Sequence, residues 1–322
     1  MKSLAEPITV VRYDASMQAL WDRFVVECKN YTFLFERGYI DYNPRFIDYS
    51  LLFYKREKLI GLLPANIDGD TLASHAGLTY GGFLLPKKSS LADVLGMFAA
   101  LRVFLQENTT VSKIVYRPVP HTYASYPAEE DLYALFRCGA SLVERRVSSV
   151  VRQSNPLPLS TLRSRKVKMA QKVGFSIVSD SNFEAFWAVL CENLQKVHKA
   201  TPVHSLNEIE LLASRFPNNI RLFRVVDDAG TTVAGTVLYL TDNVARVQYI
   251  GSVQRGRENG ALDLLFHHLL YNVYPEKAYF DFGTSVEDGG RTLNEGLIFQ
   301  KEGFGGRAVV YDTYMLDVNS II

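Results

Sequence analysis

The two halves of this chain carry the same predicted elements in the same order, and this duplication restricts the fold more than any other feature. Its two tryptophans mark the repeat, because each lies on the apolar face of an amphipathic helix. The first face comprises Met17, Leu20, Trp21, Phe24 and Val25, and the second comprises Phe183, Phe186, Trp187, Leu190 and Leu194. Further along each half, two apolar strands form a hairpin, with Gly61 and Gly235 at matching places.

The repeat continues beyond the hairpins with a strand that ends in tyrosine and glycine, then an amphipathic helix, then an apolar strand. The matched segments are residues 80–82 and 249–251, 91–106 and 261–272, and 112–118 and 277–283. A helix, two or three antiparallel strands, a helix and a strand make a compact α/β unit, so we expect two α/β (α+β) units. Pro156 and Pro158 exclude helix between the halves, which predicts domains at 1–152 and 153–322.

The composition is that of a globular protein. The 322 residues are 48% hydrophobic and 21% charged, enough for two buried cores, and a net charge of +1 provides no overall attraction for nucleic acid. No apolar run approaches the ~18 residues of a membrane span, and the N-terminal sequence lacks a secretion signal, so we expect a cytoplasmic protein with no membrane span. The three cysteines lack metal-ligand spacing, and we expect no metal site. The oligomeric state is not indicated.

The segment 279–307 combines polar side chains with glycine-rich turns. It predicts a buried strand, a polar loop, and a helix that Thr292 and Glu295 cap and that Gly303 ends in a left-handed turn. Three polar residues lie at the end of the strand and in the first and last turns of the helix, where a packed core has no use for charge. They are Asp281, Asn294 and Lys301. This pattern predicts one wall of an active site; solvated polar residues with capping glycines are the alternative.

Three motifs carry a resemblance to a known family. They are residues 249–252 (YIGS), 280–283 (FDFG) and 294–297 (NEGL), the last leading into Lys301, Phe304 and Gly305. These last three match a closing motif Phe-Lys-x-x-Phe-Gly, with Gln300 where the first aromatic is expected. The chain resembles the GCN5-related N-acyltransferases (GNAT) and, in its pairing of two units, the tandem FemABX-like transferases. The resemblance implies two GNAT-like domains, mixed sheets flanked by helices, and transfer of an acyl or aminoacyl group to an amine.

The resemblance also implies roles for residues of the second half. The donor would lie between the strands 244–253 and 278–283, beside Tyr249, with the backbone amides of Gly251 and Ser252 donating to its carbonyl oxygen. Lys301 would stabilise the oxyanion, and Asp281 would orient the amine or accept its proton. The alternatives remain open: Lys301 can simply complement the helix dipole, and Asp281 can cap the Gly283 turn.

Two classes of donor, acyl-CoA and aminoacyl-tRNA, are compatible with the sequence. Acyl-CoA enzymes of this fold hold pyrophosphate on a glycine-rich loop before a helix, and Arg255, Arg257 and Gly260 lie in the corresponding loop. Glu258 and Leu262 depart from that pattern, so acyl-CoA is the first expectation and aminoacyl-tRNA the second. A basic helix at 160–173 could contact a phosphate-rich donor or could be a solvated helix face. Its cations are Arg163, Arg165, Lys166, Lys168 and Lys172.

Candidate acceptor residues come from polar and aromatic positions in both halves. They are His75, Tyr80, His198, His204, Tyr39 and Arg45. We expect them to contact an amine acceptor, either a small molecule such as a nucleotide-linked sugar or a cell-envelope precursor such as a peptidoglycan precursor. Each also has a plain packing role as its alternative. A third hypothesis is a non-catalytic module that only binds a ligand between its two lobes.

Overall fold

The computed structural model describes residues 6–198 and 201–321, which form two compact units. Unit 1 comprises Met1–Arg146, Asp288–Arg291 and Val310–Ile322, and unit 2 comprises Val147–Glu287 and Thr292–Val309. The units are not contiguous in sequence, unlike the expected domains 1–152 and 153–322. The reason is that two long strands, β7 (Ser141–Arg152) and β15 (Arg307–Asp317), each contribute residues to both units.

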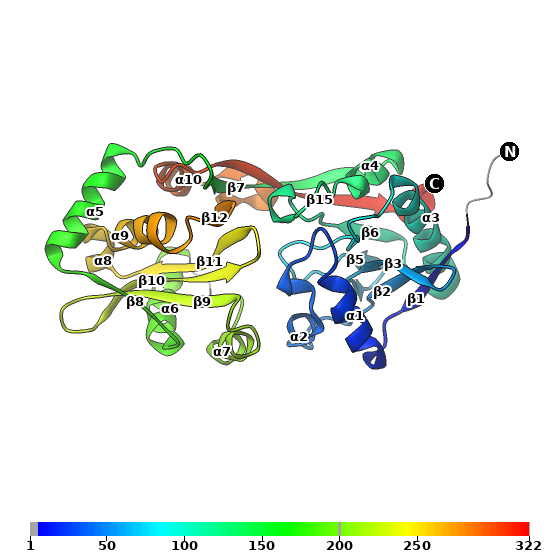
Figure 1. Cartoon of the computed structure of the whole chain (residues 1–322), viewed down its shortest axis with the longest axis horizontal. Helices are drawn as coiled ribbons and strands as arrows, with labels where there is room; N and C mark the ends of the chain where they lie inside the picture. The colour runs from blue at the N-terminus through cyan, green and yellow to red at the C-terminus, as the bar shows by residue number, and fades with distance from the viewer. Residues whose placement is uncertain (1–5, 199–200, 322) are drawn as a thin grey trace. The chain divides into compact units, whose positions relative to one another are not determined.

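Unit 1 contains a three-stranded antiparallel sheet and a second, mixed set of strands (Figure 1). The first sheet has β1 (Ile8–Arg12), β2 (Leu51–Lys55) and β3 (Lys58–Leu63), and the second has β4 (Asn66–Asp68), β5 (Thr71–Ala73), β6 (Lys113–Tyr116) and the end of β15. The helices are α1 (Gln18–Val25), α2 (Arg37–Ile40), α3 (Leu91–Asn108) and α4 (Glu130–Arg137). The apolar face of α3 packs into the core, with Met97 and Leu101 fully buried.

Unit 2 is built on a sheet in which all neighbouring strands pair antiparallel except β11 and β12, which pair in parallel. The strands, in sheet order, are β8 (Ser176–Asp180), β9 (Ile220–Val226), β10 (Thr232–Leu240), β11 (Val244–Ser252), β12 (Tyr279–Thr284) and β7. The helices are α5 (Thr161–Val173), α6 (Phe183–His198), α7 (Leu206–Arg215), α8 (Gln254–Asn259), α9 (Ala261–His268) and α10 (Glu295–Glu302), with a π-helical turn η4 (Leu269–Val273) and a small hairpin of β13 (Val286–Glu287) and β14 (Thr292–Leu293).

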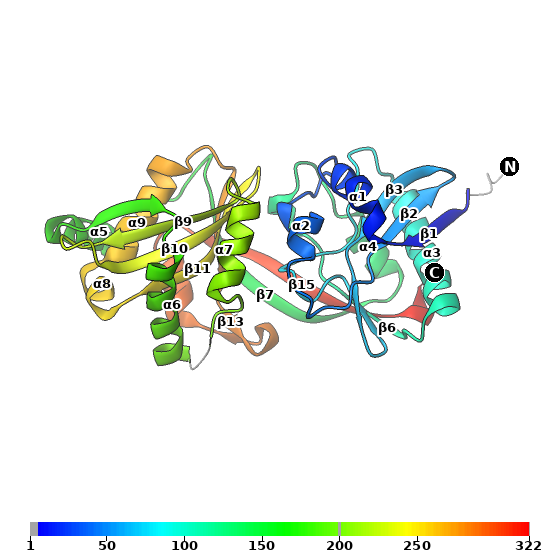
Figure 2. The same cartoon turned by 90° about the horizontal axis from the view of Figure 1, so that it is seen from below.

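Helices cover both faces of the unit 2 sheet. Figure 1 shows α9 on one face, and Figure 2 shows α6 and α7 on the other. Gly235 and Gly251 allow α6 to approach the sheet, since a Cβ at Gly235 would lie 2.6 Å from the Phe186 ring and one at Gly251 would lie 3.2 Å from the Leu190 backbone. The expected apolar face around Trp187 therefore lies against the strands, as its spacing predicts.

The structure contains the expected basic helix at 160–173, as α5, and corrects both expected ends of α10. Ser160 caps α5 through the Arg163 N–H, and Gly174 ends that helix with a φ of 84°. The expected start and stop of α10 are wrong. Asn294, and not Thr292, accepts the Leu297 N–H and caps α10, because Thr292 is already paired in β14. Gly303 keeps helical angles, and the left-handed glycine is Gly305, with a φ of 93°.

Candidate active site

The parallel pair β11 and β12 separates part-way along its length. The two strands pair only at three positions, the last being Arg246 opposite Asp281, and β11 then continues to Ser252. We call the point beyond this last pair the fork. The Val253 N–H donates to the Val233 carbonyl on β10, and neighbouring N–H groups of an extended strand point to opposite edges. The Ser252 N–H is therefore directed to the β12 side of the fork, as an amide that binds a donor would need.

Asp281 is a fully buried carboxylate at the start of the fork. Phe280 and Phe282 pack on Phe266 of α9, so alternation along β12 directs Asp281 to the opposite face of the sheet. Its Oδ1 accepts hydrogen bonds from the Ser148 hydroxyl and from the Gly283 N–H, and its Oδ2 lies 3.7 Å from the Arg246 guanidinium. These donors hold the carboxylate in one orientation, which suits a positioning role better than that of a base.

Lys301 places a buried cation on the carbonyl side of Gly283, the residue whose N–H binds Asp281. Its side chain, 6% exposed, comes from the last turn of α10, and Nζ donates to the carbonyl oxygens of Gly283 and Thr284, each at 2.8 Å. Burial lowers the pKa of Lys301 to about 8; the Asp281 charge opposes this effect, and Arg246 adds to it. A charged lysine has three N–H donors, so one donor remains after the two carbonyls are bound.

Asn294, the third catalytic candidate, has its polar atoms engaged locally. Its Oδ1 caps α10 through the Leu297 N–H at 3.0 Å, and its Nδ2 donates to the Glu287 carboxylate at 3.1 Å. These contacts fix the start of the helix that carries Lys301. Asn294 therefore supports the position of Lys301 from the other end of α10.

Unit 1 contains a corresponding fork, but a serine bridges it. Strands β5 and β6 also pair in parallel at three positions, ending with Ala73 opposite Val115. The Ser74 N–H donates to the Val115 carbonyl, the Arg117 N–H donates to Ser74 Oγ, and the Gly81 N–H donates to the Arg117 carbonyl. In unit 2, the N–H that matches Arg117 is that of Gly283, and it binds Asp281 instead. The duplicated position is thus closed in unit 1.

The expected donor loop is packed against α5. Gly260 has a φ of 77°, and it and Ala261 are buried, with the Lys166 carbonyl 2.5 Å from where a Cβ of Gly260 would lie. The two arginines of the loop already have partners in the protein. Arg255 binds the Asp227 carboxylate at 2.7 Å, and Arg257 binds the Ser252 carbonyl at 2.5 Å.

Two residues assigned to different ligands lie together on the α6 and α7 face. The Tyr249 hydroxyl contacts His204 Nδ1, and it accepts the His204 N–H at 3.2 Å. Both side chains are buried, and the Tyr249 ring packs edge-on to Trp187. Gly251 serves the packing of α6. His198 ends α6, and its side chain lies outside the described residues.

His75 and Tyr80, expected to contact acceptor, lie in the loop that follows β5 in unit 1. His75 is 3% exposed and has a φ of 62°, a strained conformation for a residue with a side chain, and its Nδ1 is buried without a hydrogen bond among the described residues. Burial lowers the pKa of His75 to about 4, so the ring is neutral at pH 7. Tyr80 packs inside an aromatic cluster, 4.7 Å from the Tyr123 ring.

The remaining two acceptor candidates differ in solvent exposure. Tyr39 is buried on α2 and packs edge-on to Phe33. Arg45 is exposed, and its backbone N–H and Nε both donate to Asn43 Oδ1 at 3.0 Å. Their expected contact with an acceptor stays a prediction.

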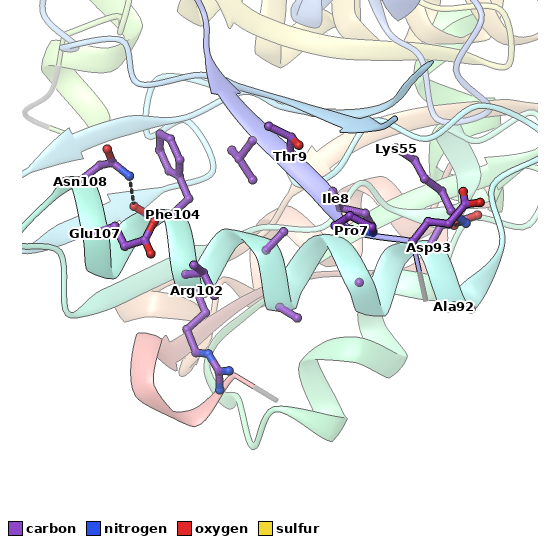
Figure 3. Close-up of a pocket in the computed structure, with 16 residues that line it drawn as sticks. Pro7, Ile8, Thr9, Lys55, Ala92, Asp93, Arg102, Phe104, Glu107 and Asn108 are labelled. Atoms are coloured by element: carbon purple, nitrogen blue, oxygen red, sulfur yellow. Dashed lines mark hydrogen bonds and ion pairs between the residues drawn. The ribbon is translucent and has the colours of Figure 1, made fainter. Parts of the chain in front are cut away.

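A groove of about 710 Å³ lies on unit 1, away from the predicted site residues. It runs between β1 and α3, and Figure 3 shows the Lys55 and Asp93 ion pair at one end and Phe104 and Asn108 at the other. Small residues such as Gly96 are among those that line it. Among the described residues, no three His, Cys, Asp or Glu side chains are grouped to hold a metal ion, and no helix is long and apolar enough to cross a membrane.

The sequence analysis missed Arg246 and Ser148 as partners of Asp281. Arg246 had a usable signal, because it is a cation within the otherwise apolar strand VARVQYI. Ser148 had none, since it lies in the first half of the chain and reaches Asp281 only because β7 pairs with β12.

Comparisons with known proteins agree with this architecture. No protein-family model matches the sequence, and no curated protein sequence matches it. Among solved structures, FemX aligns over 94% of this chain and 96% of its own, with 12% identity and a TM-score of 0.66. L-PGS from Bacillus licheniformis aligns over 99% and 95%, with 11% identity and a TM-score of 0.60. The chain has a FemX-like tandem GNAT fold.

A third structure supports the tandem assignment. A tandem GNAT protein from the clavulanic acid biosynthesis pathway aligns over 97% of this chain and 98% of its own, with 12% identity and a TM-score of 0.53. The tandem GNAT fold confirms the expected fold class and the resemblance to FemABX-like proteins. At these identities the likeness extends to the fold alone.

Proposed function

We propose that this chain is an acyltransferase whose reaction takes place at the β11 and β12 fork of unit 2. One observation carries the proposal. Lys301 is buried, and its Nζ donates to two backbone carbonyls of β12, at Gly283 and Thr284, beyond the last pair of β12 with β11. One N–H donor of the lysine therefore remains at the fork. A preorganised cation of this kind stabilises the oxyanion of acyl transfer, a contribution typically worth ~2.7 to 4 kcal/mol.

The proposed reaction is attack of a neutral amine on an ester or thioester carbonyl. The nitrogen forms a bond to the carbonyl carbon, and the carbonyl oxygen becomes an oxyanion that Lys301 and the Ser252 N–H stabilise. The bond to the leaving oxygen or sulfur then breaks, and the amine proton passes to that leaving group. Asp281 orients the turn that holds Lys301 and does not take the proton. The products are an amide and the free carrier.

Acyl-CoA and aminoacyl-tRNA remain the two donor candidates. Acyl-CoA has support from the tandem GNAT neighbour, whose structure is named as the form without AcCoA. A specific observation favours aminoacyl-tRNA as the second candidate: Gly260 and Ala261, where a pyrophosphate would meet the start of α9, are buried under α5. The C-terminal domain of a putative lysylphosphatidylglycerol synthetase from Agrobacterium fabrum also shares the fold, at a TM-score of 0.57 and 11% identity, and that synthetase is named for an aminoacyl product.

The proposed acceptor is an amine of a small molecule or of a cytoplasmic cell-envelope precursor. The His204 and Tyr249 pair supports an acceptor position, because it lies on the same face of the sheet as Asp281. A binding module without catalysis is the competing hypothesis, and it predicts ligand binding with no turnover.

The test is a transfer assay on the full chain. Purified protein is incubated with acetyl-CoA or with lysyl-tRNA, together with a panel of amines that includes glucosamine, UDP-glucosamine and lysine, and new amide is measured by mass spectrometry. We expect transfer by the wild type and loss of it in Lys301→Met. Equal turnover by both proteins would contradict the proposed role of Lys301. Binding of a donor with no turnover on any amine would favour the binding module.

A further inference from the structure

The five cations of α5 divide into two sets. Arg163 pairs with Asp263 of α9 at 2.7 Å, and Lys166 donates to the Glu258 carbonyl of α8, so these two attach α5 to its unit. The other three are exposed and form no hydrogen bond or ion pair within residues 6–198 and 201–321. They are Arg165, Lys168 and Lys172.

The three exposed cations form a single stripe along α5. Positions i, i+3 and i+7 share one helix face, and the stripe extends ~10 Å along the axis at 1.5 Å per residue. The helix contains no acidic residue, so nothing on α5 itself neutralises the stripe. A surface that gathers cations without counter-charges is suited to a partner with closely spaced negative charges.

The stripe is attached to the turn that follows Lys301. The Ser160 N–H, at the cap of α5, donates to the Gly303 carbonyl at 2.8 Å, and the Arg163 guanidinium lies 5.7 Å from the centre of the Phe304 ring. The Leu157 carbonyl lies 2.7 Å from where a Cβ of Gly305 would be. In Figure 1, α5 extends from this turn alongside α8 and α9. A long donor could thus contact α5 while its acyl end reaches Lys301.

We propose that Arg165, Lys168 and Lys172 form a docking surface for the RNA part of an aminoacyl donor. This inference rests on the proposed function. The fork locates the reacting centre, and the inference adds a surface on α5 that would bind the rest of the donor. RNA fits because its phosphates repeat along a strand on the scale of the stripe. CoA fits less well, since the start of α9 is buried.

A membrane surface is the competing partner for a basic helix. An interfacial helix inserts an apolar face among the lipid chains, whereas the apolar residues Val167 and Ala170 of α5 are buried in unit 2. Met169 and Val173 are exposed beside the cations, at 41% and 38%, which is a small apolar contribution without an aromatic anchor. These observations favour RNA.

The test measures binding of deacylated tRNA to the full chain at several salt concentrations. The variant replaces Arg165, Lys168 and Lys172 with glutamine, and the matched control replaces Lys58, Lys87 and Lys88, three exposed lysines of unit 1, in the same way. Loss of three phosphate contacts should reduce the slope of log K against log salt by about 2 to 3 and weaken binding about 10- to 100-fold. The control should bind like the wild type. A single Lys168→Glu variant, checked for an unchanged Tm, repeats the test with minimal disturbance.

Several outcomes would overturn the inference. Equal losses in the α5 variant and the control would show that only net charge matters. Loss of binding to anionic phosphatidylglycerol vesicles with tRNA binding intact would assign the stripe to a membrane. Loss of the Tm increase caused by free CoA, with tRNA binding intact, would assign it to CoA. The Lys301→Met variant separates the two proposals, because it should bind tRNA normally and fail to transfer. Normal transfer by Lys301→Met would contradict the proposed function. The docking surface is tested independently, by the binding of tRNA to the α5 variant.

Discussion

Asp281 and Lys301 bind the two ends of one residue, Gly283. The Asp281 carboxylate accepts the Gly283 N–H at 2.7 Å, and the Lys301 ammonium donates to the Gly283 carbonyl at 2.8 Å. Gly283 has a φ of 76°, a conformation that favours glycine. The acid therefore positions the turn that positions the cation. Asp281 and Lys301, two of the candidates from the sequence, therefore act together through Gly283 but have different roles.

Replacing Lys301 with methionine should reduce transfer activity far more than it changes stability. Methionine keeps most of the apolar contacts of the lysine stem, while the oxyanion loses its cation, so we expect kcat to fall about 10² to 10³-fold. Methionine removes the cost of burying the ammonium but leaves the Gly283 and Thr284 carbonyls without their lysine donor, so the two effects oppose each other and we expect only a small change of Tm at pH 7. Single-turnover transfer and thermal unfolding measure the two effects.

Lys277 provides the matched control for this change. Its Nζ also donates to two successive backbone carbonyls, those of Thr241 and Asp242, but at the start of β12, away from the fork. Lys277→Met should keep wild-type kcat. A comparable loss of activity in both variants would mean that Lys301 acts only by holding backbone.

The lowered pKa of Lys301 predicts opposite pH dependences for rate and stability. Its pKa is about 8 in the folded protein against 10.5 for an unburied lysine, so the unfolded chain binds more protons between these values. Lys301 therefore contributes a constant destabilisation below pH 8, which is relieved as the pH rises from about 8 to 10.5. The Tm of the wild type relative to that of Lys301→Met should therefore rise across that range. After correction for the fraction of neutral acceptor amine at each pH, the rate should fall above about pH 8, as the cation is lost; a corrected rate that rises there would indicate a base.

Asp281→Asn tests positioning against proton transfer. Asparagine keeps an oxygen for the Gly283 N–H but removes the charge that raises the pKa of Lys301. We expect a loss of about 1 to 3 kcal/mol in the free energy of unfolding, since Arg246 loses a buried partner, and a rate decline that begins at lower pH. An essential base would instead give an enzyme that is inactive at every pH. Asp180→Asn, which alters an ion pair with Arg224 outside the fork, is the control.

Gly260→Ala tests whether α5 is packed closely over the start of α9. Both Gly260 and Gly174 have positive φ, so alanine strains either one by about 1 kcal/mol. At Gly260 the added methyl group would also lie 2.5 Å from the Lys166 carbonyl, whereas at Gly174 it would meet nothing within 4 Å. Urea unfolding should show Gly260→Ala to be less stable than Gly174→Ala by a further 1 to 3 kcal/mol. Equal losses would indicate that the α5 contact yields easily.

The sequence predicted the local helices and strands well, but it did not predict that two strands contribute residues to both units. The helix faces around Trp21 and Trp187 and the basic helix at 160–173 follow from spacing and side-chain chemistry, which act within a few residues. The cap of α10 was misplaced by two residues, because the pairing of Thr292 in β14 overrides its preference for a cap. The exchange of β7 and β15 between units depends on strand pairing across the chain, which no local pattern reports.

By itself, the sequence determined that the chain repeats one α/β unit and that Asp281 and Lys301 are polar groups at the ends of buried elements. Periodicity and capping suffice for this, since both are written in adjacent residues. Only the tertiary structure decided which repeat has an unbridged fork, because Ser74 closes one through hydrogen bonds to Val115 and Arg117. The packing of α5 over Gly260, and hence the exposure of its three remaining cations, likewise depends on contacts between residues that are distant in sequence.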